Sequence, residues 1–248
     1  LTKTYATTLP LWRYDVSEDE KYFAASQGHF ENVGAYFPDL TEEYIENNSY
    51  IYLFDLRNDS LLWQYPVHSE VWCVDVSGDG NYIAAPIINN EKVILLNRTG
   101  NIVWDTNELG YERMLSDEVK ISHNNKYVAV GYNPGYLCLL NLSTGEKIWG
   151  NYTPFTEGQI TQIVFNEDDT RIYVGSGDGY LYLFNTSNGS MIWRTYIGTW
   201  PYRIHSLTVT PDESYIATGG KLGEVCLIDR NGILLWNFDM MGCVFWVD

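Results

Sequence analysis

The stretch NLSTGEKIW, residues 141–149, carries the pattern that decides the fold. Asn141 closes an apolar run, Thr144 and Gly145 form a turn signal, and Trp149 ends the next apolar run. Asn and Gly accept the backbone conformations of tight turns, and short apolar runs on both sides are typical of strands. The stretch therefore predicts two antiparallel strands joined by a hairpin turn.

The same pattern recurs along the chain at a nearly constant spacing. The tryptophan belongs to the series Trp63, Trp104, Trp149, Trp193 and Trp236, with steps of 41, 45, 44 and 43 residues. A polar residue that ends an apolar run forms a second series, Ser17, Ser77, Ser122, Asn166 and Thr210. A fixed period of this length indicates a repeat architecture, in which each repeat is one small structural unit.

Each repeat contains four short runs rich in β-branched and aromatic residues. The third runs, for example, read IYLFDL, VILLNR, LCLLNL, LYLFNT and VCLIDR. Four strands per repeat are the signature of β-propeller blades, which bury both faces of a twisted sheet against neighbouring blades. We therefore predict an all-β chain, a β-propeller of four-stranded antiparallel blades with about 44 residues per repeat. We expect Trp149 to pack between blades.

The repeats predict a single domain over residues 1–248. Five full repeats are expected at 11–69, 70–114, 115–158, 159–202 and 203–242, with an insertion at 27–49 in the first and the first strand of a further blade at 243–248. The segment CVFWVD at 243–248 aligns with VWCVDV of the second repeat. We therefore expect a parent polypeptide that continues past Asp248 with six or more blades. The alternative is a ring of five blades.

These motifs resemble two kinds of known propeller. The D/N-x-x-T-G-x-x-x-W spacing of residues 141–149 resembles the tryptophan-docking motif of quinoprotein-type (PQQ-like) propellers, and SGDGNYIAA at 77–85 is similar to WD-repeat units. The combination resembles β-propeller repeat proteins of archaea, which are often secreted or surface-bound. No repeat pairs the Gly-His and Trp-Asp of true WD repeats. The adjacent Cys pair of many quinoprotein alcohol dehydrogenases is also missing from the sequence, so their catalytic chemistry is not carried over.

The composition limits the classes of partner. Lys and Arg number 15 against 32 Asp and Glu, which gives a formal net charge of -17. Such an acidic chain repels phosphate backbones, so we expect no nucleic acid partner. No apolar run is long enough to span a membrane. The acidity could serve recognition of cationic groups, a high-salt environment or only solubility.

The four cysteines suggest neither a zinc site nor a redox pair. Cys73, Cys138, Cys226 and Cys243 form no C-x-x-C motif. Three of them lie inside apolar runs, where a cysteine is usually a small buried hydrophobic residue.

Candidate binding residues gather at one end of the predicted blades. We call the end with the connections between second and third strands and between blades the loop end, and the opposite end the tight-turn end. The insertion at 27–49 and the inter-blade loops bring these candidates to the loop end: Asp39, Glu42, Glu43, Glu46, Tyr65, Tyr111, Phe155, Trp200 and Tyr202. Aromatic anchors beside an acidic rim fit a protein or glycan interface. The alternative is that the aromatic residues cap sheet edges and the acids only solvate the loop.

Catalytic and metal motifs are weak. His29, His68, His123 and His205 stand in different repeats without ligand spacing. NEDDT at 166–170 is interpreted as a hairpin turn, and GSGDG at 175–179 as a loop between strands, because no helix follows to hold an anion. We therefore predict no catalytic residue, no metal and no cofactor.

N-x-S/T sequons concern the location of the protein. Asn97, Asn141 and Asn185 are the repeat's own Asn before its turn, which leaves Asn47, Asn58, Asn151 and Asn188 as glycosylation candidates. Such sites suit the surface of secreted chains.

The sequence therefore favours a non-enzymatic propeller that binds a protein or glycan partner outside the cell or at its surface. Two other functions stay open. One is a quinoprotein-like or hydrolytic enzyme with a site in the channel, and the other is a cytoplasmic scaffold of the WD-repeat kind. The oligomeric state is left open.

Overall fold

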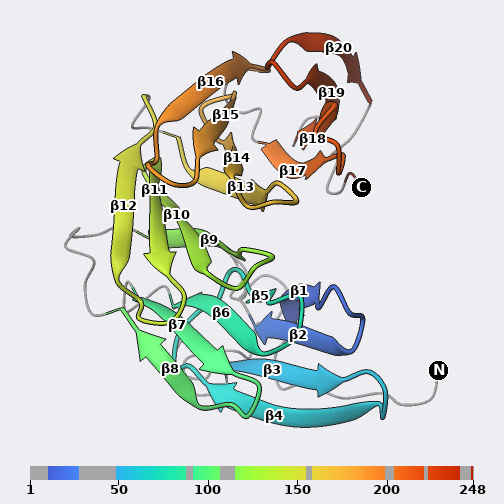
Figure 1. The fold of residues 1–248 in the computed structure, drawn as a ribbon. Coiled ribbons are helices and arrows are strands. Elements are labelled where there is room, and N and C mark those ends of the chain that lie inside the picture. Colours follow the sequence, from blue (N-terminus) through green and yellow to red (C-terminus); the bar gives the residue numbers. More distant parts are fainter. Residues whose placement is uncertain are drawn as a thin grey trace, which may run out of the picture. The chain divides into compact units, whose positions relative to one another are not determined.

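The computed structural model describes residues 11–27, 49–87, 92–106, 115–154, 158–198, 204–220, 223–240 and 247. Every regular element in these residues is a β-strand, and twenty strands form five sheets of four strands each (Figure 1). The predicted all-β fold of four-stranded antiparallel blades is confirmed.

The strands of each sheet follow one another in chain order. The first sheet consists of β1 (Leu11–Val16), β2 (Tyr22–Gln27), β3 (Tyr50–Asp55) and β4 (Ser60–Pro66). The second consists of β5 (Asp75–Val76), β6 (Tyr82–Ile87), β7 (Lys92–Asn97) and β8 (Ile102–Asp105). The third consists of β9 (Leu115–Ile121), β10 (Tyr127–Asn133), β11 (Tyr136–Asn141) and β12 (Lys147–Tyr152). The fourth consists of β13 (Ile160–Phe165), β14 (Arg171–Ser176), β15 (Tyr180–Asn185) and β16 (Met191–Tyr196), and the fifth of β17 (Ile204–Val209), β18 (Tyr215–Gly220), β19 (Glu224–Asp229) and β20 (Leu234–Asp239).

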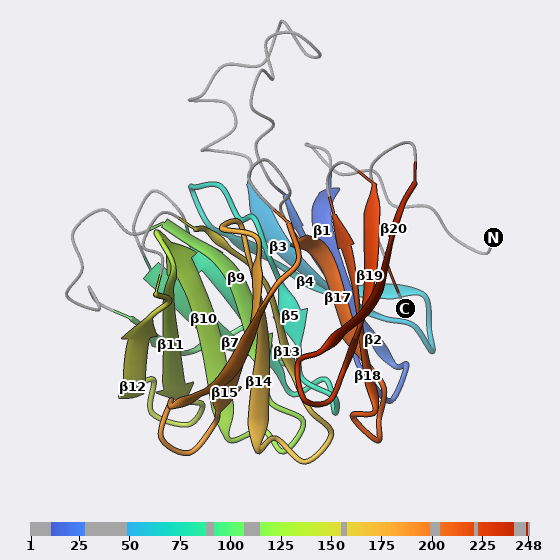
Figure 2. The same ribbon diagram turned by 90° about the horizontal axis from the view of Figure 1, so that it is seen from above.

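The chain divides into two compact units. Residues 1–121 with 143–145 form the first, and residues 122–142 with 146–248 form the second. In the second unit, the turns β13–β14 and β15–β16 lie at the same end of their sheet, as antiparallel pairing requires (Figure 2).

The polar residue that ends each first strand closes the turn to the second. Ser77 Oγ accepts a hydrogen bond from Tyr82 N at 3.0 Å and donates one to Asp79 at 2.8 Å. Asn166 does the same in the NEDDT segment, where its amide contacts Asp168 and Arg171 N. The hydroxyl and amide of Thr170 also hold the Asp168 carboxylate and lower its pKa. NEDDT is therefore a hairpin turn, as predicted.

A break in the strand register sets the direction of the repeated tryptophan side chain. In every sheet the third and fourth strands lose register directly after a Leu–Trp pair, for example after Leu139↔Trp149 and Leu183↔Trp193. A bulge turns the strand locally and redirects its side chains. Here it fixes the direction of the indole at the same place in each repeat.

The indole then docks on the turn between third and fourth strands of the following sheet. Within the first unit, Trp63 lies against Gly100 and donates to Arg98 O at 2.8 Å, and Trp104 lies against Gly145. Within the second unit, Trp149 lies against Gly189 and donates to Thr186 O at 2.7 Å, and Trp193 lies against Gly232 and donates to Arg230 O at 3.2 Å. The prediction that Trp149 packs between blades is confirmed.

Apolar side chains fill the space between these sheets. In the fourth sheet, Tyr182 and Phe184 pack into one cluster with the third sheet, while Leu181 and Leu183 pack into another with the fifth. All four are buried. Both faces of a middle sheet are thus covered, which is why no blade is stable alone.

Gly189→Ala tests the docking. Gly189 has φ +70°, and a Cβ there would lie 2.7 Å from Trp149 Cδ2. We expect a loss of about 2–4 kcal/mol in the free energy of unfolding, from left-handed backbone strain and overpacking together. Urea unfolding measures it.

The matched control is Gly189→Ala in a Trp149→Leu background. Removing the indole removes its share of the clash, so the loss is expected to fall toward the cost of the backbone strain and of the contact with Asn151 Nδ2, which lies 2.5 Å from the added Cβ. Equal losses in both backgrounds would show that the glycine does not serve the tryptophan.

Candidate functional site

Most of the predicted binding residues lie outside the described part of the chain. These are Asp39, Glu42, Glu43, Glu46, Tyr111, Phe155, Trp200 and Tyr202. Tyr65 lies in β4, half-buried against the core cluster of the first unit. Burial raises the pKa of Tyr65, and the Asp105 carboxylate raises it further. Tyr65 thus contributes to packing, and its contact with a partner stays a prediction.

Tyrosines fill the loop end of the fourth sheet. Tyr182 is fully buried and donates its hydroxyl to Asp178 Oδ2 at 2.6 Å. The Tyr180 ring lies beside it, with ring centroids 5.9 Å apart. Asp178 belongs to GSGDG, which joins β14 to β15 and so is a loop between strands, as predicted. Two large side chains and one carboxylate close this end of the sheet.

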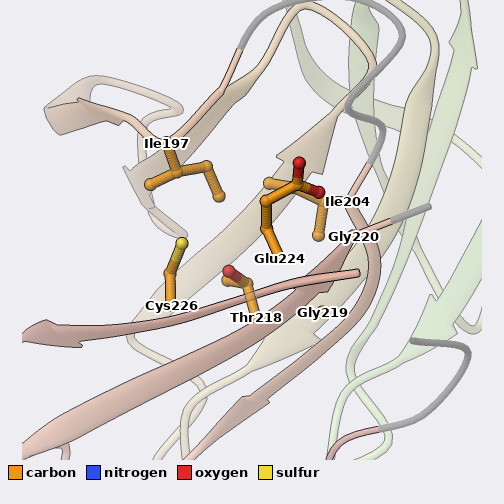
Figure 3. Close-up of a pocket in the computed structure, with 7 residues that line it drawn as sticks. All are labelled: Ile197, Ile204, Thr218, Gly219, Gly220, Glu224 and Cys226. Atoms are coloured by element: carbon orange, nitrogen blue, oxygen red, sulfur yellow. The ribbon is translucent and has the colours of Figure 1, made fainter. Parts of the chain in front are cut away.

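The fifth sheet lacks these tyrosines and is hollow at the same place. Cys226 pairs with Thr218 in the register in which Tyr182 pairs with Val174, and Glu224 stands two residues before Cys226. The smaller side chains leave a cavity of about 10 Å³, enough for one water molecule. Its lining consists of Ile197, Ile204, Thr218, Gly219, Gly220, Glu224 and Cys226 (Figure 3).

One carboxylate oxygen, Glu224 Oε2, faces this cavity without a partner in the described part of the chain. Glu224, Thr218 and Cys226 project to the same side of the sheet (Figure 3). Glu224 Oε2 is shielded from solvent, and it has no hydrogen-bond partner in the described residues. A buried acceptor without a donor costs about 1–3 kcal/mol, so such an atom calls for an explanation. A bound water, or a donor group on a ligand, would satisfy it.

The neighbouring thiol of Cys226 is buried and has a raised pKa. Burial raises the pKa of Cys226, and the Glu224 carboxylate raises it further, against a hydrogen bond with Thr218. Burial also raises the pKa of Cys138 to about 12. Because the thiolate is the reactive form, these cysteines stay protonated and inert near neutral pH. Cys73, Cys138 and Cys226 are buried, as the apolar runs around them predict.

A second polar group at the loop end of the second unit is also unsatisfied. Tyr132 lies near the end of β10 and is only 3% exposed, and its hydroxyl has no hydrogen-bond partner among the described residues. Burial raises the pKa of Tyr132 strongly, so its hydroxyl keeps its proton and can donate. Tyr132 Oη and Glu224 Oε2 are therefore polar atoms at the loop end of the second unit that the described residues leave without a partner.

The described residues do not assemble a cluster of metal-ligating side chains. No group of three or more His, Cys, Asp or Glu side chains comes together in them. The three described cysteines lie on separate strands or segments, without the adjacent pair that quinoprotein alcohol dehydrogenases use. His123 is held by Asp169 at 2.9 Å in an inter-sheet turn contact, and His68 is exposed in a connection. His29 lies outside the described residues.

The sequons differ in accessibility. Asn58 and Asn188 are exposed in turns between third and fourth strands, at the tight-turn end. Asn151 lies in β12, and its Nδ2 donates to Gly189 O at 2.7 Å. Because glycosylation needs that amide nitrogen, Asn151 is the poorest of the three candidates. Asn47 lies outside the described residues.

Glu224→Gln tests the unsatisfied carboxylate. We expect the amide to raise the free energy of unfolding by about 1 kcal/mol, because its N–H group can donate where the shielded Oε2 of Glu224 now lies without a donor among the described residues. Glu167→Gln, at an exposed turn position, is the control and is expected to change it by less than about 0.5 kcal/mol. A loss of stability in Glu224→Gln would mean that the carboxylate already has a partner.

Two family models match parts of the chain. Residues 139–243 match a PQQ-like model described as outer membrane protein assembly factor BamB. Residues 59–85 match the WD domain, G-beta repeat. No curated protein matches the chain. No helix in the described residues is long and apolar enough to cross a membrane. The resemblance to PQQ-like and WD-repeat propellers is thus confirmed, while an archaeal source stays a prediction.

Proposed function

We propose that this protein is a non-enzymatic binding module of the propeller type, which contacts a protein or glycan partner through its loop end. The insertion at 27–49 and the inter-blade loops would make the contact. We also propose that it acts outside the cell or at the cell surface.

The Glu224 oxygen beside the cavity of the fifth sheet carries this proposal. Buried polar atoms without a partner among the described residues occur at both ends of the sheets, for example Thr186 Oγ1 at the tight-turn end and Tyr132 Oη at the loop end. Glu224 Oε2 differs from Thr186 Oγ1 because it faces a cavity that can admit a donor group. A concave site with a polar atom left to pair is what a ligand's polar groups can use, which supports recognition at the loop end.

The matched families agree with a binding role. WD-repeat propellers commonly mediate protein interactions. The PQQ-like model carries the description of an assembly factor. Neither description requires a reactive residue, and the raised pKa values of Cys138 and Cys226 argue against a thiol nucleophile.

The enzymatic alternative would be supported by a tightly bound cofactor. A quinoprotein-like site in the channel would bind a quinone cofactor tightly, and the bound cofactor would be visible in the absorption spectrum. The cytoplasmic scaffold alternative differs from the proposed function in cellular location and not in binding chemistry. A leader peptide in the natural gene product would argue against this alternative.

Deletion of residues 28–48 tests the binding surface. We expect the shortened chain to lose binding to immobilised cell-envelope extract of the source organism, while its cooperative unfolding is kept, because the deleted residues connect β2 to β3. Surface plasmon resonance measures the binding. Asn188→Gln, at the opposite end, is the control and should bind like the parent. Unchanged binding after the deletion contradicts the proposed surface.

The mass of the natural protein tests its location. We expect sugar-sized additions above the 28.5 kDa of residues 1–248, lost on deglycosylation and mapped to Asn58 or Asn188. Mass spectrometry of tryptic peptides assigns the sites. Unmodified asparagine at all sequons would remove this support for an extracellular location.

A further inference from the structure

The fifth sheet holds two carboxylates opposite each other at its loop end. Glu224 is the first residue of β19, and its register partner is Asp239, the last residue of β20. Residues that pair directly across two antiparallel strands project to the same face of the sheet, and like charges in such a pair are destabilising. This pair therefore calls for a positive charge close to it.

Other sheets carry attractive pairs at the same position. Tyr136 begins β11, and its ring centroid lies 4.9 Å from that of Tyr152 in β12. The corresponding rings of the fourth sheet are 5.1 Å apart. Lys92 begins β7, and its Nζ lies 3.2 Å from Asp105 Oδ2 of β8. Among the five described sheets, the fifth is thus the one with like charges here, and the ion pairs found in the described residues do not include Glu224.

The cavity beside Glu224 accepts one small donor group. Its volume of about 10 Å³ matches a single group of the size of water. Glu224 Oε2 is shielded from solvent and has no partner in the described part of the chain. Ile197 and Ile204 supply apolar walls, and the Cys226 thiol stays neutral because burial raises its pKa (Figure 3). A group that enters between these walls meets a carboxylate oxygen that can accept a hydrogen bond.

A lysine ammonium fits these constraints better than other cations. It is a compact charge with three donors at the end of a flexible apolar stem. The guanidinium of arginine is a planar fork of N–H groups and is larger than the cavity. Calcium takes six to eight oxygen ligands, whereas no group of three or more His, Cys, Asp or Glu comes together in the described residues. The formal net charge of -17 also attracts a cationic partner.

We propose that the cavity of the fifth sheet is a pocket for a lysine side chain of a protein partner. The ammonium donates to Glu224 Oε2 and is attracted by Asp239, and the aliphatic stem lies against Ile197 and Ile204. The inference rests on the proposed function, since it names the group that the loop end recognises. It favours a protein over a glycan, because an amino sugar carries its ammonium directly on a ring that is too large for the cavity.

An NMR titration of residues 1–248 with Nα-acetyl-lysine N-methylamide tests the pocket. We expect saturable changes in the backbone amide signals of Thr218, Gly219 and Cys226 at low salt. The matched control is the same compound acetylated on its side-chain nitrogen, which keeps the stem and loses the charge. This control should cause no saturable change. Saturation by both compounds, or by neither, contradicts the proposal.

Three variants assign the binding to the carboxylates. Glu224→Gln is expected to weaken binding of the lysine probe about tenfold, because the direct acceptor of the ammonium loses its charge. Asp239→Asn is expected to weaken it about threefold, because Asp239 is exposed and acts through charge alone. Glu167→Gln, at an exposed turn position, should bind the probe like the parent. Equal affinities in all three variants would refute the pocket.

Other occupants of the cavity would give different results. Calcium ions that shift the same amide signals, without a response to the lysine probe, would indicate a metal site. Glucosamine that binds more tightly than the lysine probe would indicate a glycan. Lys221 lies outside the described residues, and probe binding that appears only in Lys221→Met would show that the chain fills its own pocket. Each of these results overturns the proposal.

Binding to cell-envelope extract separates this inference from the proposed function. Glu224→Gln should weaken that binding, as deletion of residues 28–48 should. If the deletion abolishes binding and Glu224→Gln binds like the parent, the loop end is the contact surface and the lysine pocket is wrong. If neither change affects binding, the proposed function fails, and the inference fails with it.

Discussion

The contact between an indole and a glycine turn is the constraint on which the repeat structure depends. It combines a large apolar area, a hydrogen bond to a carbonyl and a requirement for no side chain at one position. Large-to-small substitution of a buried aromatic residue costs about 3–5 kcal/mol, and the hydrogen bond adds about 1 kcal/mol. A propeller blade cannot cover its own faces, so an interaction repeated once per interface fixes both the spacing and the angle between sheets. The bulge after each Leu–Trp pair follows from this, because the strand must turn the indole outward to reach the next sheet.

A second consequence is the unequal chemistry of the two ends. The tight turns must present a glycine and a carbonyl to the preceding sheet, so their polar side chains are used locally to hold the turn. The Asp229 carboxylate shows this, since its Oδ1 accepts hydrogen bonds from Asn231 N at 2.9 Å and Ile233 N at 2.8 Å in the turn that carries Gly232. None of the described glycine turns that receive an indole lies at the loop end. At this end the fourth and fifth sheets differ, with Tyr182 in one and Cys226 in the other.

The fold was predictable from the sequence because its main constraint recurs. Trp149, Gly145 and Asn141 have counterparts at a constant step, and each identifies a local geometry that the structure confirms. The hollow beside Glu224 was missed, although a signal existed. Aligning GEVCLI with GYLYLF shows two tyrosines replaced by smaller or charged residues, but only the register tells that both positions face the neighbouring sheet. Tyr65 shows the opposite difficulty, because an aromatic residue near a loop can serve the core as readily as a surface, and only its burial separates the two.

Departures from the repeat are therefore more informative than the repeat itself. A glycine stands against the tryptophan ring at every dock that the structure shows, so this glycine marks an interface between two packed sheets. Asp59 occupies the corresponding position of the β3–β4 turn with φ 48°, so the turn itself can form without a glycine. Glu224 and Cys226 break the tyrosine pattern in the same sense, and the result is a cavity with an unsatisfied carboxylate oxygen. Packing alone does not explain why Glu224 Oε2 faces a cavity without a donor among the described residues, whereas a donor group on a ligand would, as the proposed binding role expects.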